Sequence, residues 1–298
     1  MDNVTDTTDE LEFTGERFTP ECVREIWYEH WHRYAFALPL VGGKRVLDAA
    51  CGEGYGSHLL ASAASEVVGV DISTEAVAHA RARYAGKKNL RFEYGDAAAP
   101  GFAAATFDVV VSFETLEHLA AQSELIEGFA RVLTDDGILL VSSPDKRTYS
   151  EIAGFRNEFH VRELYREELV ELLQAHFPHV RLYGQKLLFQ SALWSLDGEG
   201  GSEQTLTADA DGAQVTPTLD YAPLYYVAAC SRRPLPASLP LTSWFGDRQE
   251  SVYSHYNGEV RRNMSAGARI AELEAELARL RDSSATTPPS RWLRWLRR

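Results

Sequence analysis

An α/β fold built on a mostly parallel sheet is the fold class that this 298-residue sequence predicts. Short apolar runs alternate with longer segments of helical periodicity, and each run has the length of a buried strand. Strands joined through helices need crossover connections, which give parallel sheets covered by helices on both faces. The expected strands are 45–50, 66–71, 90–96, 107–113 and 137–143, and the clearest helices follow the first two strands.

Two further apolar runs, 180–194 and 221–231, have no helix between them. Such neighbours can pair as an antiparallel hairpin, which we expect at the edge of the sheet. The intervening residues 195–218 are rich in Gly, Asp and Thr, and this composition is typical of a mobile loop. Before the first strand, a helix is predicted from Pro20 to about Leu38, because proline suits a first helical turn.

Composition limits the classes of function. Hydrophobic residues make up 45% of the chain, a normal share for a globular protein with a sizeable core. The net charge of −13 disfavours a nucleic-acid partner, because phosphate contacts need clustered Lys and Arg. Three distant cysteines, Cys22, Cys51 and Cys230, indicate a reducing cytoplasm rather than a disulfide framework. No stretch reaches the ~18 apolar residues of a transmembrane helix, so we expect a soluble protein.

The two ends of the chain differ from this central region. Residues 1–14 are acidic and polar, which predicts disorder and is unlike a signal peptide. A proline-punctuated linker or extension is expected over 234–268. It leads to a short coiled coil at 269–282, where apolar residues recur at 3-4-3 spacing over barely two heptads: Ile270, Leu273, Leu277 and Leu280.

The last segment, 283–298, combines a linker with the tail RWLRWLRR. On a helical wheel its Trp and Leu residues oppose its four arginines, which is typical of an amphipathic helix at an anionic membrane surface. Docking onto an acidic protein partner, or no binding role at all, are the alternatives. A coiled coil that forms a homo-oligomer would strengthen any such binding by presenting several tails together.

A glycine-rich loop, VLDAACGEGYGS, follows the first predicted strand. Gly52, Gly54 and Gly56 lie where the strand gives way to a helix, and glycine there permits tight turning and close backbone approach to a ligand. Asp71 ends the next strand, where a carboxylate can accept two hydrogen bonds from a ribose diol. The loop begins with Asp48 and lacks the dinucleotide GxGxxG spacing. We therefore expect a ligand with ribose but no pyrophosphate.

Five motifs in this order, VLDAACGEGYGS, VVGVDIS, FEYGDA, FDVVVSFETLEHL and GILLVSSP, resemble those of class I S-adenosylmethionine-dependent methyltransferases. The resemblance covers roughly residues 40–190 and implies a Rossmann-like, seven-stranded sheet with a reversed final hairpin. For Ile72 and Phe113, plain core packing is the alternative to a cofactor contact. The implied cofactor residues are Asp48 at the start of the loop, Gly52 and Gly54 at the methionine part, Asp71 at the ribose, Ile72 on the adenine, Asp96 and Ala97 at its amino edge, and Phe113 beside the cofactor.

The N-terminal stretch GERFTPE, followed by WYEHWHRYAFA, resembles a segment of bacterial methyltransferases from surface-polysaccharide (O-antigen) pathways. There it forms a lid over cofactor and substrate, which implies a helical lid at 15–40 and a methyltransferase domain at 41–233. Arg17 or Arg33 is then expected to pair with the cofactor carboxylate. A surface helix that packs its aromatic residues on the sheet is the alternative.

The stretch FETLEHL places Glu114, Glu117 and His118 just after the fourth predicted strand. If a helix starts near Thr115, these side chains share one side of it, at the strand end where open α/β sheets bind ligands. His160, in NEFHVREL, follows the fifth strand and can reach the same edge. Two carboxylates with imidazole suit a divalent ion such as Mg²⁺, Mn²⁺ or Fe²⁺.

This ExxEH pattern with a later histidine resembles the metal-dependent O-methyltransferases of ubiquinone biosynthesis and of small-RNA 3′ ends. Metal coordination lowers the pKa of an alcohol and holds it in line with the methyl sulfonium. Two alternatives stay open. His118 can act alone as a catalytic general base oriented by Glu114 or Glu117, or the three residues are only a charged helix start favoured by the dipole.

The sequence thus predicts a cytoplasmic enzyme that methylates a sugar hydroxyl of a surface polysaccharide or lipid-linked glycan. A small aromatic or polyketide acceptor is the alternative substrate, and a methyltransferase-like scaffold is the non-enzymatic alternative. Through the tail we expect a position at the inner face of the membrane, or a glycosyltransferase partner.

Overall fold

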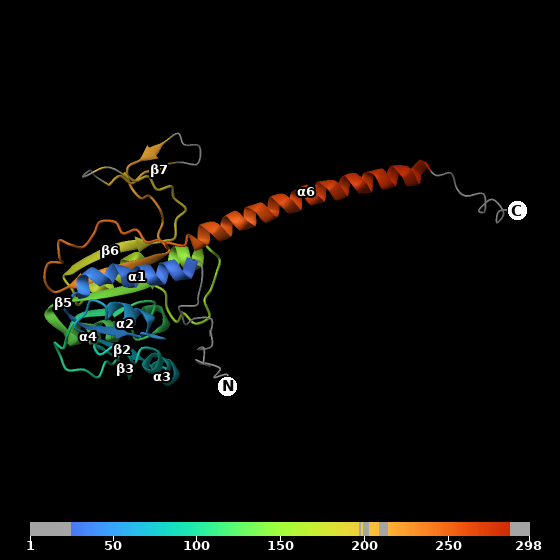
Figure 1. Ribbon diagram of the computed structural model, residues 1–298. Coiled ribbons are helices and arrows are strands. Elements are labelled where there is room, and N and C mark those ends of the chain that lie inside the picture. Colours follow the sequence, from blue (N-terminus) through green and yellow to red (C-terminus); the bar gives the residue numbers. More distant parts are fainter. Residues whose placement is uncertain (1–24, 197, 199–202, 209–213, 287–298) are drawn as a thin grey trace, which may run out of the picture. The chain divides into compact units, whose positions relative to one another are not determined.

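The computed structural model describes residues 25–196, 198, 203–208 and 214–286. The folded core is a seven-stranded sheet with the strand order β3-β2-β1-β4-β5-β9-β6 (Figure 1). The first five strands run parallel, and β9 runs antiparallel to both of its neighbours, β5 and β6, so the predicted α/β sheet with a reversed final hairpin is confirmed. The strands are β1 Arg45–Ala49, β2 Glu66–Asp71, β3 Leu90–Tyr94, β4 Phe107–Ser112, β5 Leu133–Pro144, β6 His179–Gln185 and β9 Tyr225–Ser231.

The expected antiparallel pair lies at the edge of the sheet, with its later strand on the inner side. Strand β9 lies between β5 and β6, and its Ala229 pairs with Leu140 of β5 on one side and with Arg181 of β6 on the other. Strand β6 is therefore the edge strand. The long connection from β6 to β9 contains a small antiparallel pair of its own, β7 Thr207–Ala208 with β8 Val215–Thr216.

Helices follow the parallel strands as the alternating pattern predicts. Helix α3 has the N-cap Ser73, whose Oγ accepts a hydrogen bond from the Ala76 backbone N–H at 3.1 Å. Two short helical turns, η1 Leu116–His118 and η2 Arg147–Glu151, follow β4 and β5. The helices are α1 Glu25–Val41, α2 Tyr55–Leu60, α3 Thr74–Arg83, α4 Gln122–Val132, α5 Arg166–Gln174 and α6 Ser251–Thr286.

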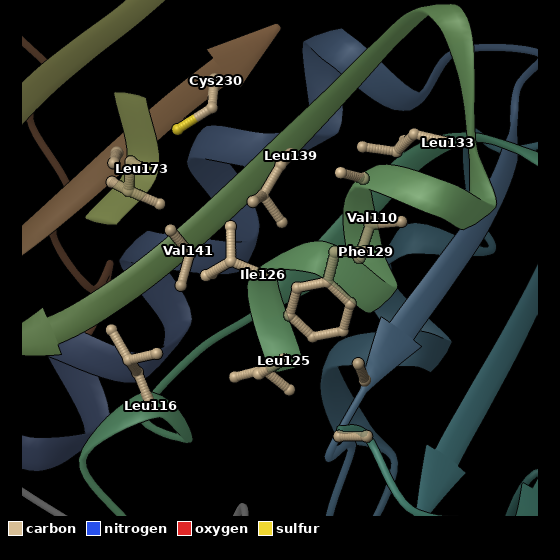
Figure 2. Packing of buried hydrophobic residues seen from close by; sticks show 14 of the residues in the cluster. Val110, Leu116, Leu125, Ile126, Phe129, Leu133, Leu139, Val141, Leu173 and Cys230 are labelled. Atoms are coloured by element: carbon tan, nitrogen blue, oxygen red, sulfur yellow. The ribbon is translucent and has the colours of Figure 1, made fainter. Parts of the chain in front are cut away.

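Alternate residues of the strands face two separate hydrophobic layers. On one face Ile126 and Phe129 of α4 pack with Leu139 and Val141 of β5, and α5 adds to the same layer (Figure 2). Leu140 of β5 faces the opposite layer, which α1 and α2 cover. Burial on both faces explains why the strands read as continuous apolar runs rather than alternating ones.

Residues Gly246–Arg298 form a unit separate from Met1–Phe245. Helix α6 begins at Ser251, so the expected linker ends well before residue 268 and the predicted coiled-coil segment lies inside a 36-residue helix. The prolines that suggested the linker all lie before residue 241, outside this helix. None of the described helices is long and apolar enough to cross a membrane. The expected disorder of residues 1–14 and the tail beyond residue 286 lie outside the described residues.

Candidate functional site

The glycine-rich loop joins β1 to α2 at the carboxyl edge of the parallel strands. Gly52 and Gly54 have φ values of 55° and 89°, in the left-handed region that favours glycine. A Cβ atom on Gly54 would lie 2.6 Å from the ring of Phe92, so a side chain there would displace that ring. The loop thus presents its backbone at the edge where open α/β sheets bind ligands.

Asp71 ends β2 and fastens this loop. Its Oδ2 accepts a hydrogen bond from the Gly52 backbone N–H at 2.8 Å, and its Oδ1 accepts one from the Ser73 backbone N–H at 2.8 Å. Each carboxylate oxygen has a further lone pair. Asp71 can therefore hold the loop and still accept hydrogen bonds from a ribose diol, although the ribose contact itself stays a prediction.

The other predicted cofactor residues differ in exposure. Ile72 is 65% exposed, so it is not a core residue and its apolar face is open to a ligand. Asp96 is exposed, and the adjoining Ala97 is buried. Phe113 is buried, and its ring packs edge-on against that of Tyr34 at 5.1 Å. Core packing therefore accounts for Phe113, whereas it does not account for Ile72.

Asp48 lies inside the protein rather than at the open edge. It is fully buried, and its carboxylate accepts hydrogen bonds from Ser57 Oγ at 2.6 Å and from Tyr34 Oη at 3.1 Å. These bonds connect β1 to both α1 and α2. Burial raises the pKa of Asp48 to about 7, although the hydrogen bonds from Ser57 and Tyr34 oppose this shift. In the structure, Asp48 holds the loop and helices in place, and its contact with the cofactor stays a prediction.

This raised pKa makes a prediction about stability and pH. The folded protein binds the Asp48 proton more readily than the unfolded chain, so Asp48 makes the free energy of unfolding fall as pH rises from about 4 to about 7. We expect Asp48→Asn to reduce that fall, because the amide stays neutral. Urea denaturation of both proteins at several pH values measures it. A stability difference between them that is the same at pH 4 and pH 7 would contradict the assignment.

Arg33 of α1 is a buried cation close to the end of β4. It is 1% exposed, and its Nε donates a hydrogen bond to Gln185 Oε1 at 2.8 Å. Its Nη2 lies 3.4 Å from Glu114 Oε1, and its guanidinium lies 4.6 Å from the ring centre of Tyr225. Within the described residues neither Nη atom has a hydrogen-bond acceptor. Pairing with a cofactor carboxylate stays a prediction for Arg33, and Arg17 lies outside the described residues.

Glu114 does not take part in the helix that the sequence predicts. Its φ is 52°, in the left-handed region, and the helical turn that follows spans only Leu116–His118. Its Oε1 accepts a hydrogen bond from Ser142 Oγ at 2.6 Å, and its backbone N–H donates to the same Oγ at 2.9 Å. A helical turn does begin just after Thr115, but Glu114 does not share a side of it with Glu117 and His118, because Ser142 and Arg33 hold Glu114 in the turn between strand and helix.

Glu117, His118 and His160 are brought together from two segments of the chain. One potential ligand atom from each lies within 4.8 Å of the others, and Glu114 lies outside this group. The His118 Nε2 atom lies 3.9 Å from Glu117 Oε1, and the His118 and His160 rings meet edge-on at 5.0 Å. The structure thus assembles three of the four predicted metal ligands.

Glu117 is the most deeply buried member of this group, with only 1% of it exposed. Neither of its carboxylate oxygens has a hydrogen-bond partner among the described residues. Burial, reinforced by the nearby Glu114, raises the pKa of Glu117 well above its ordinary value. A buried carboxyl that lacks compensation is costly unless a proton or a cation neutralises it.

Several residues that position this group were missed by sequence reasoning. His160 Nδ1 lies 2.7 Å from Glu163 Oε1, and His160 Nε2 lies 3.0 Å from Asn157 Nδ2. The ring of Tyr149 stacks on that of His160 at 5.3 Å. On the other side, His118 Nδ1 lies 3.2 Å from the backbone oxygen of Phe159. Asn157 and Glu163, each three residues from His160 in RNEFHVRE, were the available signal.

The chain is similar in sequence to known methyltransferases. A probable S-adenosylmethionine-dependent methyltransferase of Mycobacterium tuberculosis is 38% identical over 178 residues, which cover 58% of this chain and 64% of that protein. A ubiquinone biosynthesis O-methyltransferase of Actinobacillus pleuropneumoniae is 33% identical over 108 residues, covering 34% of this chain and 46% of that protein. The crystal structure of the YcgJ protein from Bacillus subtilis is 19% identical, with a TM-score of 0.49, over 68% of this chain and 100% of that one.

The match is partial at the level of the whole protein, since the chain spans less than two thirds of the length of these curated relatives. A family model described as a methyltransferase domain matches residues 40–199, which is more than half of the chain. That range contains the glycine loop, Asp71 and the group formed by Glu117, His118 and His160. With the sheet order described above, this match shows that the chain belongs to the class I S-adenosylmethionine-dependent methyltransferases.

Proposed function

We propose that this protein transfers a methyl group from S-adenosylmethionine to a hydroxyl oxygen. The observation that carries the proposal is the group of Glu117, His118 and His160 at the end of β4, on the sheet edge that also carries the glycine loop and Asp71. In the reaction the bond from the methyl carbon to sulfur breaks and a bond from that carbon to oxygen forms. S-adenosylhomocysteine leaves, and the hydroxyl proton must pass to a base.

The same group suits a divalent cation. The buried Glu117 carboxyl would supply an anionic oxygen once a cation replaced its proton, and the two histidines offer ring nitrogens within the same 4.8 Å. The Glu163 carboxylate beside His160 Nδ1 is the kind of outer contact that orients a ligating imidazole. A bound Mg²⁺ or Mn²⁺ would lower the pKa of the acceptor hydroxyl and fix its position. Asn157, close to His160 Nε2, would have to turn aside for that nitrogen to bind a cation.

His118 also has the geometry of a general base. When Nδ1 carries the ring proton it donates to the Phe159 backbone oxygen, and Nε2 then presents a lone pair on the side of Glu117. The side chain of His118 is 30% exposed, so that an acceptor hydroxyl can reach it. Proton transfer to His118 is therefore the metal-free form of the same proposal.

A sugar hydroxyl of a surface polysaccharide or lipid-linked glycan is the acceptor that we favour. The resemblance of the N-terminal segment to polysaccharide-pathway methyltransferases supports it. Two exposed aromatic rings near the site, Phe155, which packs edge-on against Tyr149, and Phe159, offer flat apolar faces to the C–H faces of a sugar. The same rings suit a small aromatic or polyketide acceptor, which is the second candidate. The net charge of −13 disfavours an RNA acceptor.

Turnover of methyl-labelled S-adenosylmethionine in host extract tests the proposal. Products are separated into lipid-linked glycan, RNA and small-molecule fractions, with and without a chelator, and Asp71→Ala serves as the inactive control. We expect label in the glycan fraction that chelation removes. Label that survives chelation would support the His118 base instead of a metal, and label only among small molecules would exclude the glycan acceptor. Cofactor binding without labelling of any fraction would favour a methyltransferase-like scaffold.

A further inference from the structure

Helix α6 presents a row of apolar side chains to solvent. The helix spans Ser251–Thr286, and its large apolar residues are all substantially exposed. Leu277 at 51% and Leu280 at 60% are far more exposed than the leucines of the sheet layers. Exposed apolar rows of this kind are costly in water and mark a surface that another protein covers.

The row follows a heptad repeat that extends N-terminal to the coiled coil predicted at 269–282. With Ile270 and Leu277 at a positions, Leu273 and Leu280 occupy the d positions. Extending the same register toward the N-terminus places Asn263 at a and Ala266 at d, and one heptad earlier Tyr256 at a. Glu259 at d is the one charged residue in this row, so the continuous part runs from residue 263 to residue 280.

The charges beside the row are complementary to a second copy of the same helix. Arg269 and Glu276 occupy g positions, and Glu274 and Arg281 occupy e positions. In a parallel pair, a g residue of one helix faces the e residue of the next heptad in the other helix. Arg269 would then face Glu274 of the second copy, and Glu276 would face its Arg281. Both contacts join opposite charges, and each occurs twice by symmetry.

We propose that α6 pairs with the α6 of a second copy of this chain as a parallel, two-stranded coiled coil. This interaction surface is separate from the proposed methyltransferase site and does not depend on it. Ile270 at a with Leu273 at d favours two strands rather than three or four. Asn263 at an a position fixes the register, because its two copies can hydrogen-bond only when they lie opposite each other.

In the single chain, Arg269 lies 2.9 Å from Glu272 on the same helix. Both side chains are about two-thirds exposed, and exposed ion pairs contribute little to stability. Arg269 can therefore leave Glu272 and pair with Glu274 of the second copy at little cost in free energy. The stabilisation of the pair comes from covering the apolar row, and the charges select the parallel orientation.

Sedimentation equilibrium of the full-length protein over a range of concentrations tests the pairing. We expect reversible formation of a species with twice the 33.3 kDa chain mass. Leu277→Asp, in the apolar row, should give a monomer at all concentrations, whereas Ala275→Asp, which adds the same charge on the outer side of the helix, should still dimerise. A monomeric wild type, a trimer, or a dimer that Leu277→Asp leaves intact would each overturn the proposal.

Charge reversals test the parallel orientation. Arg269→Glu and Glu274→Arg each bring like charges together in a parallel dimer of the variant, and each should raise the dimer dissociation constant about tenfold. Mixing the two variants restores opposite charges at both contacts, so a heterodimer as stable as the wild-type dimer is expected. If the mixture dimerises no better than either variant alone, the helices do not pair in the parallel register.

Discussion

Asp71→Ala is expected to weaken S-adenosylmethionine binding at least about 100-fold and to reduce methyl transfer to background. A ribose diol donating two hydrogen bonds to this carboxylate would contribute about 1.5–3 kcal/mol for each bond. The substitution also releases the Gly52 backbone N–H, so the glycine loop loses the contact that holds it. Isothermal titration with the cofactor measures the effect.

The matched control for this experiment is Glu127→Ala. Glu127 is an exposed acidic residue on α4, so its removal changes the net charge equally without touching the glycine loop. Thermal unfolding of both variants shows whether the loop remains folded. If a folded Asp71→Ala protein binds the cofactor as tightly as the wild type does, Asp71 does not hold the ribose.

Glu117→Gln is expected to abolish Mn²⁺ binding and to lower methyl transfer at least about 100-fold, while cofactor affinity stays close to that of the wild type. The amide keeps the shape of the side chain but removes the anionic oxygen that a cation needs. The amide is neutral, and a neutral group is less costly to bury than a carboxylate at a position that is 1% exposed. The folded protein should therefore be no less stable than the wild type. Titration with Mn²⁺ and labelled turnover measure the two effects separately.

Glu124→Gln, at an exposed position in the first turn of α4, controls for loss of one negative charge. If Glu117→Gln binds Mn²⁺ as the wild type does, the metal site is excluded. If the wild type binds no Mn²⁺ but His118→Ala removes turnover, the residues act without a metal, with His118 as the base. In that case Glu117 serves to position the imidazole.

The sheet was predictable because its signals are local. Each parallel strand is a short apolar run. The helix that follows returns the chain to the other end of the sheet, so that the next strand runs in the same direction. The antiparallel pairing of β6 with β9 was also predictable from the two apolar runs, but the position of β9 between β5 and β6 is a choice among distant partners that the runs do not reveal. The extent of α6 was missed because the prolines before residue 241 suggested a linker that continued to residue 268.

The site was predictable where a residue type has one use and unpredictable where it has several. The left-handed backbone at Gly54 favours glycine, so the glycine in the sequence already indicated this turn. Asp48 shares the same motif, yet the structure buries it under Ser57 and Tyr34. For Glu114 and Glu117, helical spacing suggested a common face. The left-handed turn at Glu114 keeps it off that face, although it stays near Glu117, and the turn depends on Ser142 of β5.

The position of β9 also sets the order in which the sheet can be completed as the chain is made. Strand β5 ends at Pro144, but its neighbour on that side begins only at Tyr225. During synthesis from the N-terminus, β5 therefore keeps an open edge, and β6 has no strand to join until β9 emerges. An open edge invites pairing with other chains. Because β9 fills the place between β5 and β6, the emergence of residues 225–231 is the step that protects the nascent domain.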